Sequence, residues 1–371
     1  MHLPALALSS LLLASTSAYA KITNLVTFGD SYTDQSRLTA FYTNGSIPAH
    51  YQEVYPPGAY AANGGSTWVK YAEEFGGLET WNYAVSGASC SNLLTPRHDL
   101  GAPKATSGVF PSVSEYEISA FLTDHLVNTT YGGWALDLDP EETIYSLWIG
   151  TNDLGVDSLL TGNQIPGVTL VNTTACALNV FRTLYQYGAR KFLLMNMIPL
   201  QLTPLYSRDA TNSRYWKNEF NATSWNIFMT ELVTSGNELW RLGAPALAHE
   251  LKGAEVGLFD SYGLFWDMYH EPEAYGLDNV TGWVAHCPVS GSGNCSYAVS
   301  DYKTNGNQDR FLWFDELHPS EPAEKIVARE VVNAIKGSGR ITTWYRTPPV
   351  KRSSLSSKPA SSRTMHPNPP Y

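Results

Sequence analysis

Hydrophobic runs that stop at glycine or polar residues recur along the chain and alternate with segments of helical spacing. The runs are rich in β-branched and aromatic residues, which predicts buried strands at residues 24–28, 80–85, 143–149, 191–197 and 254–259. Apolar side chains recur every three or four positions in the other segments, which predicts helices at residues 68–75, 114–126, 174–187, 225–249 and 320–335. Strands and helices that alternate at this pitch predict an α/β protein, with a parallel sheet covered by helices on both faces.

Two segments are too long to be plain connectors. Residues 42–66 are polar and aromatic, and residues 278–311 are rich in glycine, serine and asparagine. Long ordered loops in compact enzymes usually shape a site, so we expect these insertions to surround the functional site. The length would fit one domain or two, and we expect one α/β domain with long loop insertions over residues 21–346.

The two ends of the chain are expected to lie outside this domain. The apolar run at residues 3–13 is too short to span a bilayer, and Ala18-Tyr19-Ala20 fits a small-x-small cleavage site. Residues 1–20 are therefore predicted to be a secretory signal peptide, which makes the mature protein secreted and extracellular. Proline, serine and lysine dominate residues 347–371, which are predicted to be a disordered tail because they cannot form a core.

Cysteines and glycosylation signals agree with secretion. Four cysteines in a secreted chain predict two disulfides, and none has the C-x-x-C spacing of a zinc or redox site. Three pairings are possible; we expect the local pair Cys287–Cys295 and, by default, Cys90 with Cys176. The sequence also holds N-glycosylation sequons, each expected in a surface loop, at Asn44, Asn128, Asn172, Asn221, Asn279 and Asn294.

The charge of the chain limits its partners. The sequence has 24 Lys and Arg against 34 Asp and Glu, and the tail from residue 347 holds four of the basic residues and no acid, which leaves a net charge of −14 before it. Such a surface repels nucleic acid and anionic lipid at neutral pH. We therefore expect a small neutral substrate, no nucleic acid, no stable membrane association and a monomer.

Ser31 lies where the first predicted strand ends, because Gly29-Asp30 must turn the chain. In open parallel sheets, ligands bind at the carboxyl ends of the strands. A serine there can be a nucleophile if a base lies within hydrogen-bond reach and a third group orients that base. Asp315 and His318, three residues apart on one turn, would place both side chains on the same side.

Other interpretations of these residues exist. An isolated Asp-x-x-His is more often a surface turn than a catalytic pair. Asp267 and His270 have the same spacing, but they lie in an apolar run that predicts a helix packed on the sheet, with the polar pair facing solvent. The tetrahedral oxyanion also needs preorganised donors. Gly87 and Asn152 both follow predicted strand ends and could supply them, although each could equally be a turn residue.

Together these residues resemble the GDSL, or SGNH, family of serine esterases, which is named for Ser, Gly, Asn and His in four sequence blocks. The blocks are residues 28–32, 82–87, 150–153 and 315–319; they follow the family's order and span nearly the whole mature chain. The resemblance implies a flavodoxin-like three-layer α/β/α sandwich, the SGNH hydrolase fold, as the catalytic domain.

The same resemblance implies a role for each site residue. Ser31 would be the nucleophile, His318 the base, and Asp315 the group that orients His318. The oxyanion hole would consist of Ser31 N–H, Gly87 N–H and the Asn152 side-chain amide. Tyr32 stands where the family name has leucine, a position that we expect to lie outside the chemistry. No Gly-x-Ser-x-Gly elbow occurs, which counts against an ordinary α/β-hydrolase.

The run at residues 148–153, with predicted secretion and aromatic loops, also resembles the secreted fungal members grouped as carbohydrate esterase family sixteen, which remove acetyl groups from sugars and short xylan fragments. Our leading hypothesis is therefore a secreted carboxylic ester hydrolase. It would remove acetyl groups from carbohydrates such as acetylated xylo-oligosaccharides through an acyl-Ser31 intermediate, with no metal or cofactor. A GDSL lipase or phospholipase and a non-catalytic glycan-binding protein remain as alternatives.

Overall fold

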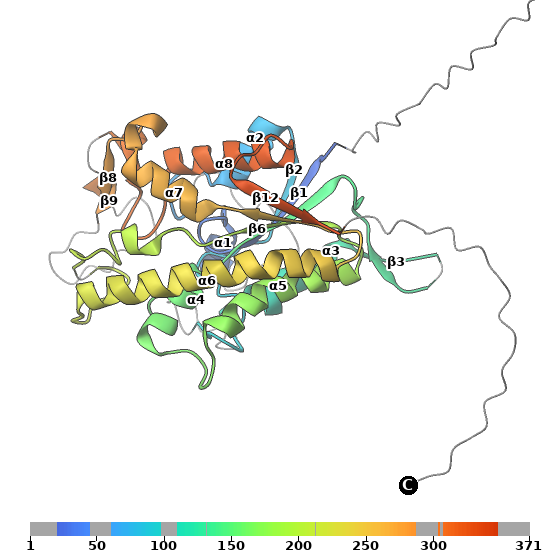
Figure 1. Cartoon of the computed structure of the whole chain (residues 1–371), viewed down its shortest axis with the longest axis horizontal. Helices are drawn as coiled ribbons and strands as arrows, with labels where there is room; N and C mark the ends of the chain where they lie inside the picture. The colour runs from blue at the N-terminus through green and yellow to red at the C-terminus, as the bar shows by residue number, and fades with distance from the viewer. Residues whose placement is uncertain are drawn as a thin grey trace, which may run out of the picture.

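The computed structural model describes residues 21–44, 61–97, 110–130, 132–211, 213–286, 303–304 and 307–347 (Figure 1). The predicted signal peptide, the predicted pair Cys287–Cys295, the sequon at Asn294 and the tail from residue 348 lie outside the described residues. So does most of each predicted loop insertion. Thr347 is described, and its hydroxyl donates to the carbonyl of Ala248 (2.6 Å), so the described chain extends one residue beyond the predicted domain boundary.

A mostly parallel sheet forms the centre of the domain and confirms the predicted fold class. Its strands are β1 (Asn24–Gly29), β2 (Glu79–Asn82), β5 (Thr143–Trp148), β6 (Lys191–Met195), β7 (Glu255–Phe259) and β12 (Thr342–Arg346). They are arranged in the order β12-β7-β6-β5-β1-β2, and only β12 pairs in the antiparallel direction. Without β12, this is the strand order of a flavodoxin-like doubly wound sheet.

Two details of the sheet differ from the sequence prediction. The second strand, expected over residues 80–85, is β2 at Glu79–Asn82, although Tyr83 N and Val85 N still donate to the carbonyls of Thr27 (2.9 Å) and Gly29 (3.1 Å). The edge strand β12 was not predicted, because its residues mix polar and apolar side chains and half of its backbone groups face no partner strand. An edge strand needs no continuous apolar run, since only its inner side packs.

Helices cover both faces of the sheet, as predicted. The described helices of eight residues or more are α1 (Arg37–Asn44), α2 (Trp68–Gly76), α3 (Ile118–His125), α5 (Leu170–Gln186), α6 (Ala222–Glu250), α7 (Ser261–His270) and α8 (Glu321–Ile335). Figure 1 shows α2, α7 and α8 on one face and α5 and α6 on the other. Alternate side chains of β5 reach the two layers: Tyr145 packs against Phe121 of α3, and Trp148 packs against Phe265 of α7.

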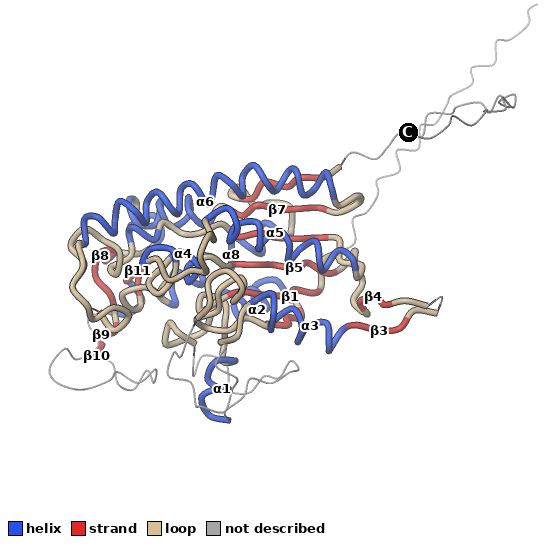
Figure 2. Tube along the Cα trace, turned by 90° about the horizontal axis from the view of Figure 1, so that it is seen from below, coloured by secondary structure: helices blue, strands red, loops and turns tan. Residues whose placement is uncertain are grey.

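Short elements complete the described chain. They are η1 (Val113–Glu117), β3 (Leu126–Asn128), β4 (Trp134–Leu136), α4 (Thr151–Leu154), η2 (Leu159–Thr161), η3 (Leu200–Leu202), η4 (Pro272–Tyr275), β8 (Asn279–Trp283), β9 (Ala285–His286), β10 (Lys303–Thr304), η6 (Gln308–Arg310) and β11 (Phe311–Trp313). Strand β8 pairs with β11, and β9 pairs with β10. Figure 2 shows these small pairs beyond one end of the central strands.

The structure joins Cys90 to Cys176, the pair that the sequence analysis expected by default. This bond links the segment after β2 to α5. Among the described residues, three sequon asparagines are exposed, but they lie in a strand, in a helix or at a helix end and not in the predicted loops. Asn128 is exposed in β3, Asn172 is exposed in the first turn of α5, and Asn221 is the exposed N-cap of α6, while Asn279 is half-buried at the start of β8. Asn44 is the last residue of α1. Asparagine accepts backbone N–H groups at helix ends and turns, which explains several of these places.

Candidate active site

The chain turns sharply where β1 ends, and this turn places Ser31. Gly29 has a φ of +150°, and a Cβ atom there would lie 2.3 Å from the carbonyl oxygen of Trp148. Only glycine therefore fits against the end of β5. The carbonyl of Asp30 accepts a hydrogen bond from Thr33 N (3.0 Å) and closes the turn. Ser31 consequently lies at the carboxyl edge of the parallel sheet.

Ser31, His318 and Asp315 form one hydrogen-bonded chain. His318 Nε2 lies 2.7 Å from Ser31 Oγ, and His318 Nδ1 lies 3.0 Å and 2.9 Å from the two carboxylate oxygens of Asp315. The Ser31 side chain keeps a small opening to solvent, with 8% of the residue exposed, whereas Asp315 is fully buried. In this arrangement an imidazole can accept the serine proton while a carboxylate holds the opposite ring N–H.

A tight turn after β11 positions the imidazole. Phe314 N donates to the carbonyl of His318 (2.8 Å), so the turn is closed across its base. Within it, one oxygen of Asp315 accepts from the backbone N–H groups of Leu317 and His318, both at 2.8 Å. With this spacing of three residues, the same carboxylate both closes the turn and contacts the ring of His318.

Asp315 stays ionised although it is buried. Burial acts to raise the pKa of this carboxyl, but attraction to His318 and to Arg214, together with hydrogen bonds from His318, outweighs burial and holds the pKa well below its usual value. Arg214 donates to the second carboxylate oxygen, and so does the hydroxyl of Tyr215, at 2.9 Å. Neither residue is recognisable from the sequence, because both lie about 100 positions upstream in a segment without a known motif.

Gly87 and Asn152, the two residues proposed with Ser31 for the oxyanion hole, lie on neighbouring segments. The Asn152 side-chain amide donates to the carbonyl of Ala88 (2.9 Å), the residue after Gly87. Gly87 has a φ of +89°, where glycine is favoured. The N–H just before Gly87 donates to Asp34 (2.8 Å), on the turn that carries Ser31. An N–H and an amide held in this way could stabilise a developing oxyanion.

Glu117 supports this edge of the sheet and was not identified from the sequence. It is fully buried at the end of η1, and its two oxygens accept from Gly29 N (2.9 Å) and Val85 N (3.2 Å). Burial raises its pKa well above the usual value, against these hydrogen bonds and the attraction of Arg37. The only sequence signal was an acid inside an apolar helical segment. Glu117 therefore joins the end of β1 to the segment that follows β2.

Two more buried acids flank the site. Asp30 accepts from Tyr32 N (3.0 Å), and burial, with repulsion from Asp153, raises its pKa to about 7. Asp153 accepts from Thr95 Oγ1 (2.7 Å) and from Cys90 N (3.1 Å), and burial raises its pKa to about 6. Asp153 thus joins the segment that holds Asn152 to the disulfide-bonded segment after β2.

Tyr32, which stands where the family name has leucine, packs beside the turn that carries His318. Its hydroxyl donates to the carbonyl of Leu317 (3.0 Å), and its ring meets the His318 ring edge-on at 5.9 Å. The ring also packs edge-on against Trp148. The residue is buried and connects the turn of Ser31 with the turn of His318. It supports the base and takes no hydrogen bond to the reacting groups.

The competing pair, Asp267 and His270, lies on α7 as expected. Both residues are exposed, and His270 Nδ1 contacts the carbonyl of Trp266 (2.9 Å) in the preceding turn. The His270 and Trp266 rings stack with their centroids 4.3 Å apart. This pair therefore belongs to the solvent-facing side of a helix, because its apolar neighbours Leu264 and Phe265 occupy the buried side.

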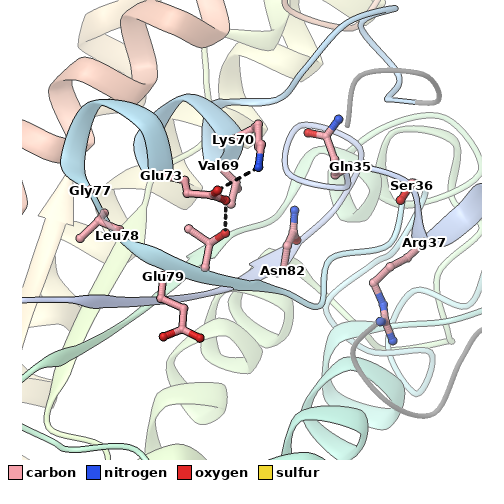
Figure 3. A pocket seen from close by; sticks show the side chains of 11 residues that line it. Gln35, Ser36, Arg37, Val69, Lys70, Glu73, Gly77, Leu78, Glu79 and Asn82 are labelled. Atoms are coloured by element: carbon pink, nitrogen blue, oxygen red, sulfur yellow. Dashed lines mark hydrogen bonds and ion pairs between the residues drawn. The ribbon is translucent and has the colours of Figure 1, made fainter. Parts of the chain in front are cut away.

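A separate cavity of about 490 Å³ opens along the edge strand β2 and α2 (Figure 3). Its lining includes Lys70, Glu73 and Thr80, which are linked by hydrogen bonds, and the side chains of Arg37 and Asn82. Ser31, His318 and Asp315 do not line it. This cavity is thus distinct from the place where the proposed nucleophile and base meet.

Among the residues that the structure describes, no helix is both long enough and apolar enough to cross a membrane. Within the same residues, no three His, Cys, Asp or Glu side chains are grouped so that they could hold a metal ion.

A hydroxyl, an imidazole and a carboxylate linked in this order at the carboxyl edge of a flavodoxin-like sheet define the class of serine hydrolases. Residues 25–331 match the model of the GDSL-like lipase/acylhydrolase family, so the chain belongs to that family and is a carboxylic ester hydrolase. It is 34% identical to an acetylesterase of Hypocrea jecorina over 86% of this chain and 91% of that protein.

The chain is also similar to further proteins. An acetylesterase of Thermothelomyces thermophilus is 26% identical over 85% of this chain and 88% of its own length. Among solved structures, an acetylxylan esterase from Geobacillus stearothermophilus aligns with a TM-score of 0.37 and 14% identity, covering 85% of this chain and 95% of that one.

Proposed function

We propose that this protein is a secreted acetylesterase that removes acetyl groups from neutral carbohydrates, such as acetylated xylo-oligosaccharides. The observation that carries the proposal is the contact of 2.7 Å between Ser31 Oγ and His318 Nε2, with Asp315 on the opposite ring nitrogen. Two relatives that align along most of this chain are named acetylesterases, which supports an acetyl group as the acyl part. The catalytic domain would comprise residues 21–346.

The proposed reaction has two halves. Ser31 Oγ attacks the ester carbonyl while His318 Nε2 takes the hydroxyl proton, and the oxyanion forms beside Ser31 N–H, Gly87 N–H and the Asn152 amide. His318 then gives the proton to the leaving sugar oxygen, which leaves an acetyl-serine. Water attacks this ester and gives a proton to His318, and His318 passes that proton to Ser31 Oγ as the acyl–oxygen bond breaks, which releases acetate and restores the free serine. Asp315 orients the ring throughout.

The anionic surface supports a neutral substrate. Before residue 347 the net charge is −14, and such a surface repels anionic lipid and polyanions. A sugar ester carries no charge and meets no such barrier. A series of p-nitrophenyl esters from acetate to palmitate tests the preference for a small acyl group. The acetate ester should be the best substrate, whereas a preference for long acyl chains would indicate a lipase instead of an acetylesterase.

The decisive experiment measures acetate release from acetylated xylo-oligosaccharides by the wild type and by Ser31→Ala. Removal of the nucleophile should lower kcat by about 10⁴-fold or more, as in other serine hydrolases. A fluorophosphonate should label the wild type and not the variant. Acetate release by Ser31→Ala at the wild-type rate would overturn the proposal.

A further inference from the structure

Arg214 and Tyr215 approach the proposed catalytic residues from the segment between η3 and α6. Arg214 Nη2 donates to one oxygen of Asp315 and to the hydroxyl of Tyr215. The same hydroxyl lies 2.9 Å from that Asp315 oxygen and 3.0 Å from His318 Nδ1. These two neighbouring residues therefore meet the carboxylate and the ring on the side opposite to Ser31.

We propose that Arg214 and Tyr215 are positioning residues that lock the Asp315 carboxylate and, through it, the His318 ring in the reactive orientation. This inference rests on the proposed function, because it assigns a task to residues that act through the Ser31–His318–Asp315 chain. Neither residue touches Ser31 in the contacts of the described chain, so neither is a catalytic residue.

The geometry shows why the carboxylate needs a second set of partners. One oxygen of Asp315 is fixed by the backbone N–H groups of Leu317 and His318. The other oxygen is held by Arg214 and Tyr215. With both oxygens held, the carboxylate cannot rotate about its Cβ–Cγ bond without breaking a hydrogen bond. The ring nitrogen that it contacts then keeps one position and one tautomer.

Both supporting side chains are themselves held in place. Arg214 is 13% exposed, and its guanidinium lies over the Tyr215 ring at 4.5 Å from the ring centre. Burial raises the pKa of Tyr215 well above its usual value, although the charge of Arg214 opposes this, so its hydroxyl keeps its proton and acts as a donor. A protonated phenol and a charged guanidinium together direct donors at one buried oxygen.

The positive charge of Arg214 also acts on the ionisation of the neighbouring acids, which packing alone would not do. The titratable groups that face Asp315 are His318 and Glu316 from its own turn, Tyr32 from the turn after β1, and Arg214 and Tyr215 from the opposite segment. Arg214 brings its positive charge to two adjacent acids, Asp315 and Glu316. If this charge is removed, Asp315 should accept a proton at higher pH and stop orienting the ring.

The test compares Tyr215→Phe, Arg214→Met and Arg214→Lys with the wild type, using p-nitrophenyl acetate over a range of pH. Tyr215→Phe removes one hydroxyl and should lower kcat about three- to tenfold. Arg214→Met removes a buried charged donor and should lower kcat about ten- to a hundredfold. It should also move the acid limb of the kcat/KM profile to higher pH. Arg214→Lys restores the charge and should return that limb toward the wild-type position.

Matched controls separate positioning from general loss of structure. Tyr185→Phe removes a hydroxyl that donates to Lys252 O (2.9 Å), and Arg241→Met removes an ion pair with Glu238, both away from the site. Neither should change kcat or the pH profile. If Arg214→Met does not fold, as judged by circular dichroism, then Arg214→Lys and Tyr215→Phe are compared with the wild type instead.

The outcomes distinguish this inference from the proposed function. The inference alone would be overturned if Ser31→Ala is inactive while Tyr215→Phe and the Arg214 variants keep the wild-type kcat and the wild-type acid limb. An active Ser31→Ala would overturn the proposed function, on which the inference rests. Lower kcat with KM close to the wild type, and an acid limb that moves only when the charge at position 214 is lost, would support it.

Discussion

Glu316 offers a direct measurement of the free energy that burial of a charge costs beside the proposed active site. The residue follows Asp315 and is 7% exposed, and its Oε2 atom has no hydrogen-bond partner among the described residues. Burial, with repulsion from Asp315, raises its pKa from 4.5 to about 7, although Arg214 acts in the opposite direction. Replacement by glutamine keeps the shape of the side chain and removes its ionisation.

The size of the effect follows from the pKa of Glu316 in the folded and unfolded states. Each pKa unit corresponds to about 1.4 kcal/mol, so the rise from 4.5 to about 7 corresponds to about 3 kcal/mol. Below pH 4.5 both states hold the proton and the contribution to stability is fully present. Between pH 4.5 and 7 the unfolded chain loses the proton first, so the free energy of unfolding falls as pH rises. Above pH 7 the loss is complete.

The assay is urea unfolding followed by tryptophan fluorescence at pH 4 and pH 8, for the wild type and Glu316→Gln. Other buried acids also titrate in this window, so the informative quantity is the difference between the two proteins. That difference should favour the variant by up to about 3 kcal/mol more at pH 8 than at pH 4. Glu231→Gln, on the exposed side of α6, should show no such change. A difference that is the same at both pH values would refute the reasoning.

Two further perturbations address the oxyanion side of the site. Asn152→Ala removes a side-chain donor and should lower kcat about 10²- to 10³-fold while KM changes little. Steady-state kinetics with p-nitrophenyl acetate measure both constants. A wild-type kcat would exclude the amide from the oxyanion hole. Replacement of Cys90 and Cys176 by serine frees the segment after Gly87 from α5. This double replacement should lower the free energy of unfolding by about 2–4 kcal/mol and reduce kcat. A variant that is as stable as the wild type in urea would contradict the expected loss of stability.

The central strands were predictable because burial on both faces leaves a plain signal. The segments 143–149 and 191–197 are almost continuously apolar, as fully covered parallel strands are, and they became β5 and β6 with slightly earlier ends. The edge strand β12 and the hairpin of β3 and β4 were missed. They are short or half-exposed, and their residues carry no pattern that distinguishes them from loops.

The proposed catalytic residues were predictable because each belongs to a short motif next to a strand end. Ser31 and Asn152 directly follow runs that predict buried strands, and Asp315 and His318 share one turn. Local geometry accounts for these positions. The partners Arg214, Tyr215 and Glu117 have no such motif, since they act through contacts between segments that are distant in the chain.

By itself, the sequence determined which segments would be the central strands, where polar groups would stand at strand ends, and which residues could form a nucleophile, a base and a set of neutral donors. Apolar patterning and turn chemistry are local, so they can be read from neighbouring residues. Only the tertiary structure decided that Ser31 Oγ and His318 Nε2, which are 287 positions apart in the chain, lie 2.7 Å from each other. It also decided which buried groups complete the site, because low-dielectric contacts such as Arg214 with Asp315 exist only after folding has removed water from both partners.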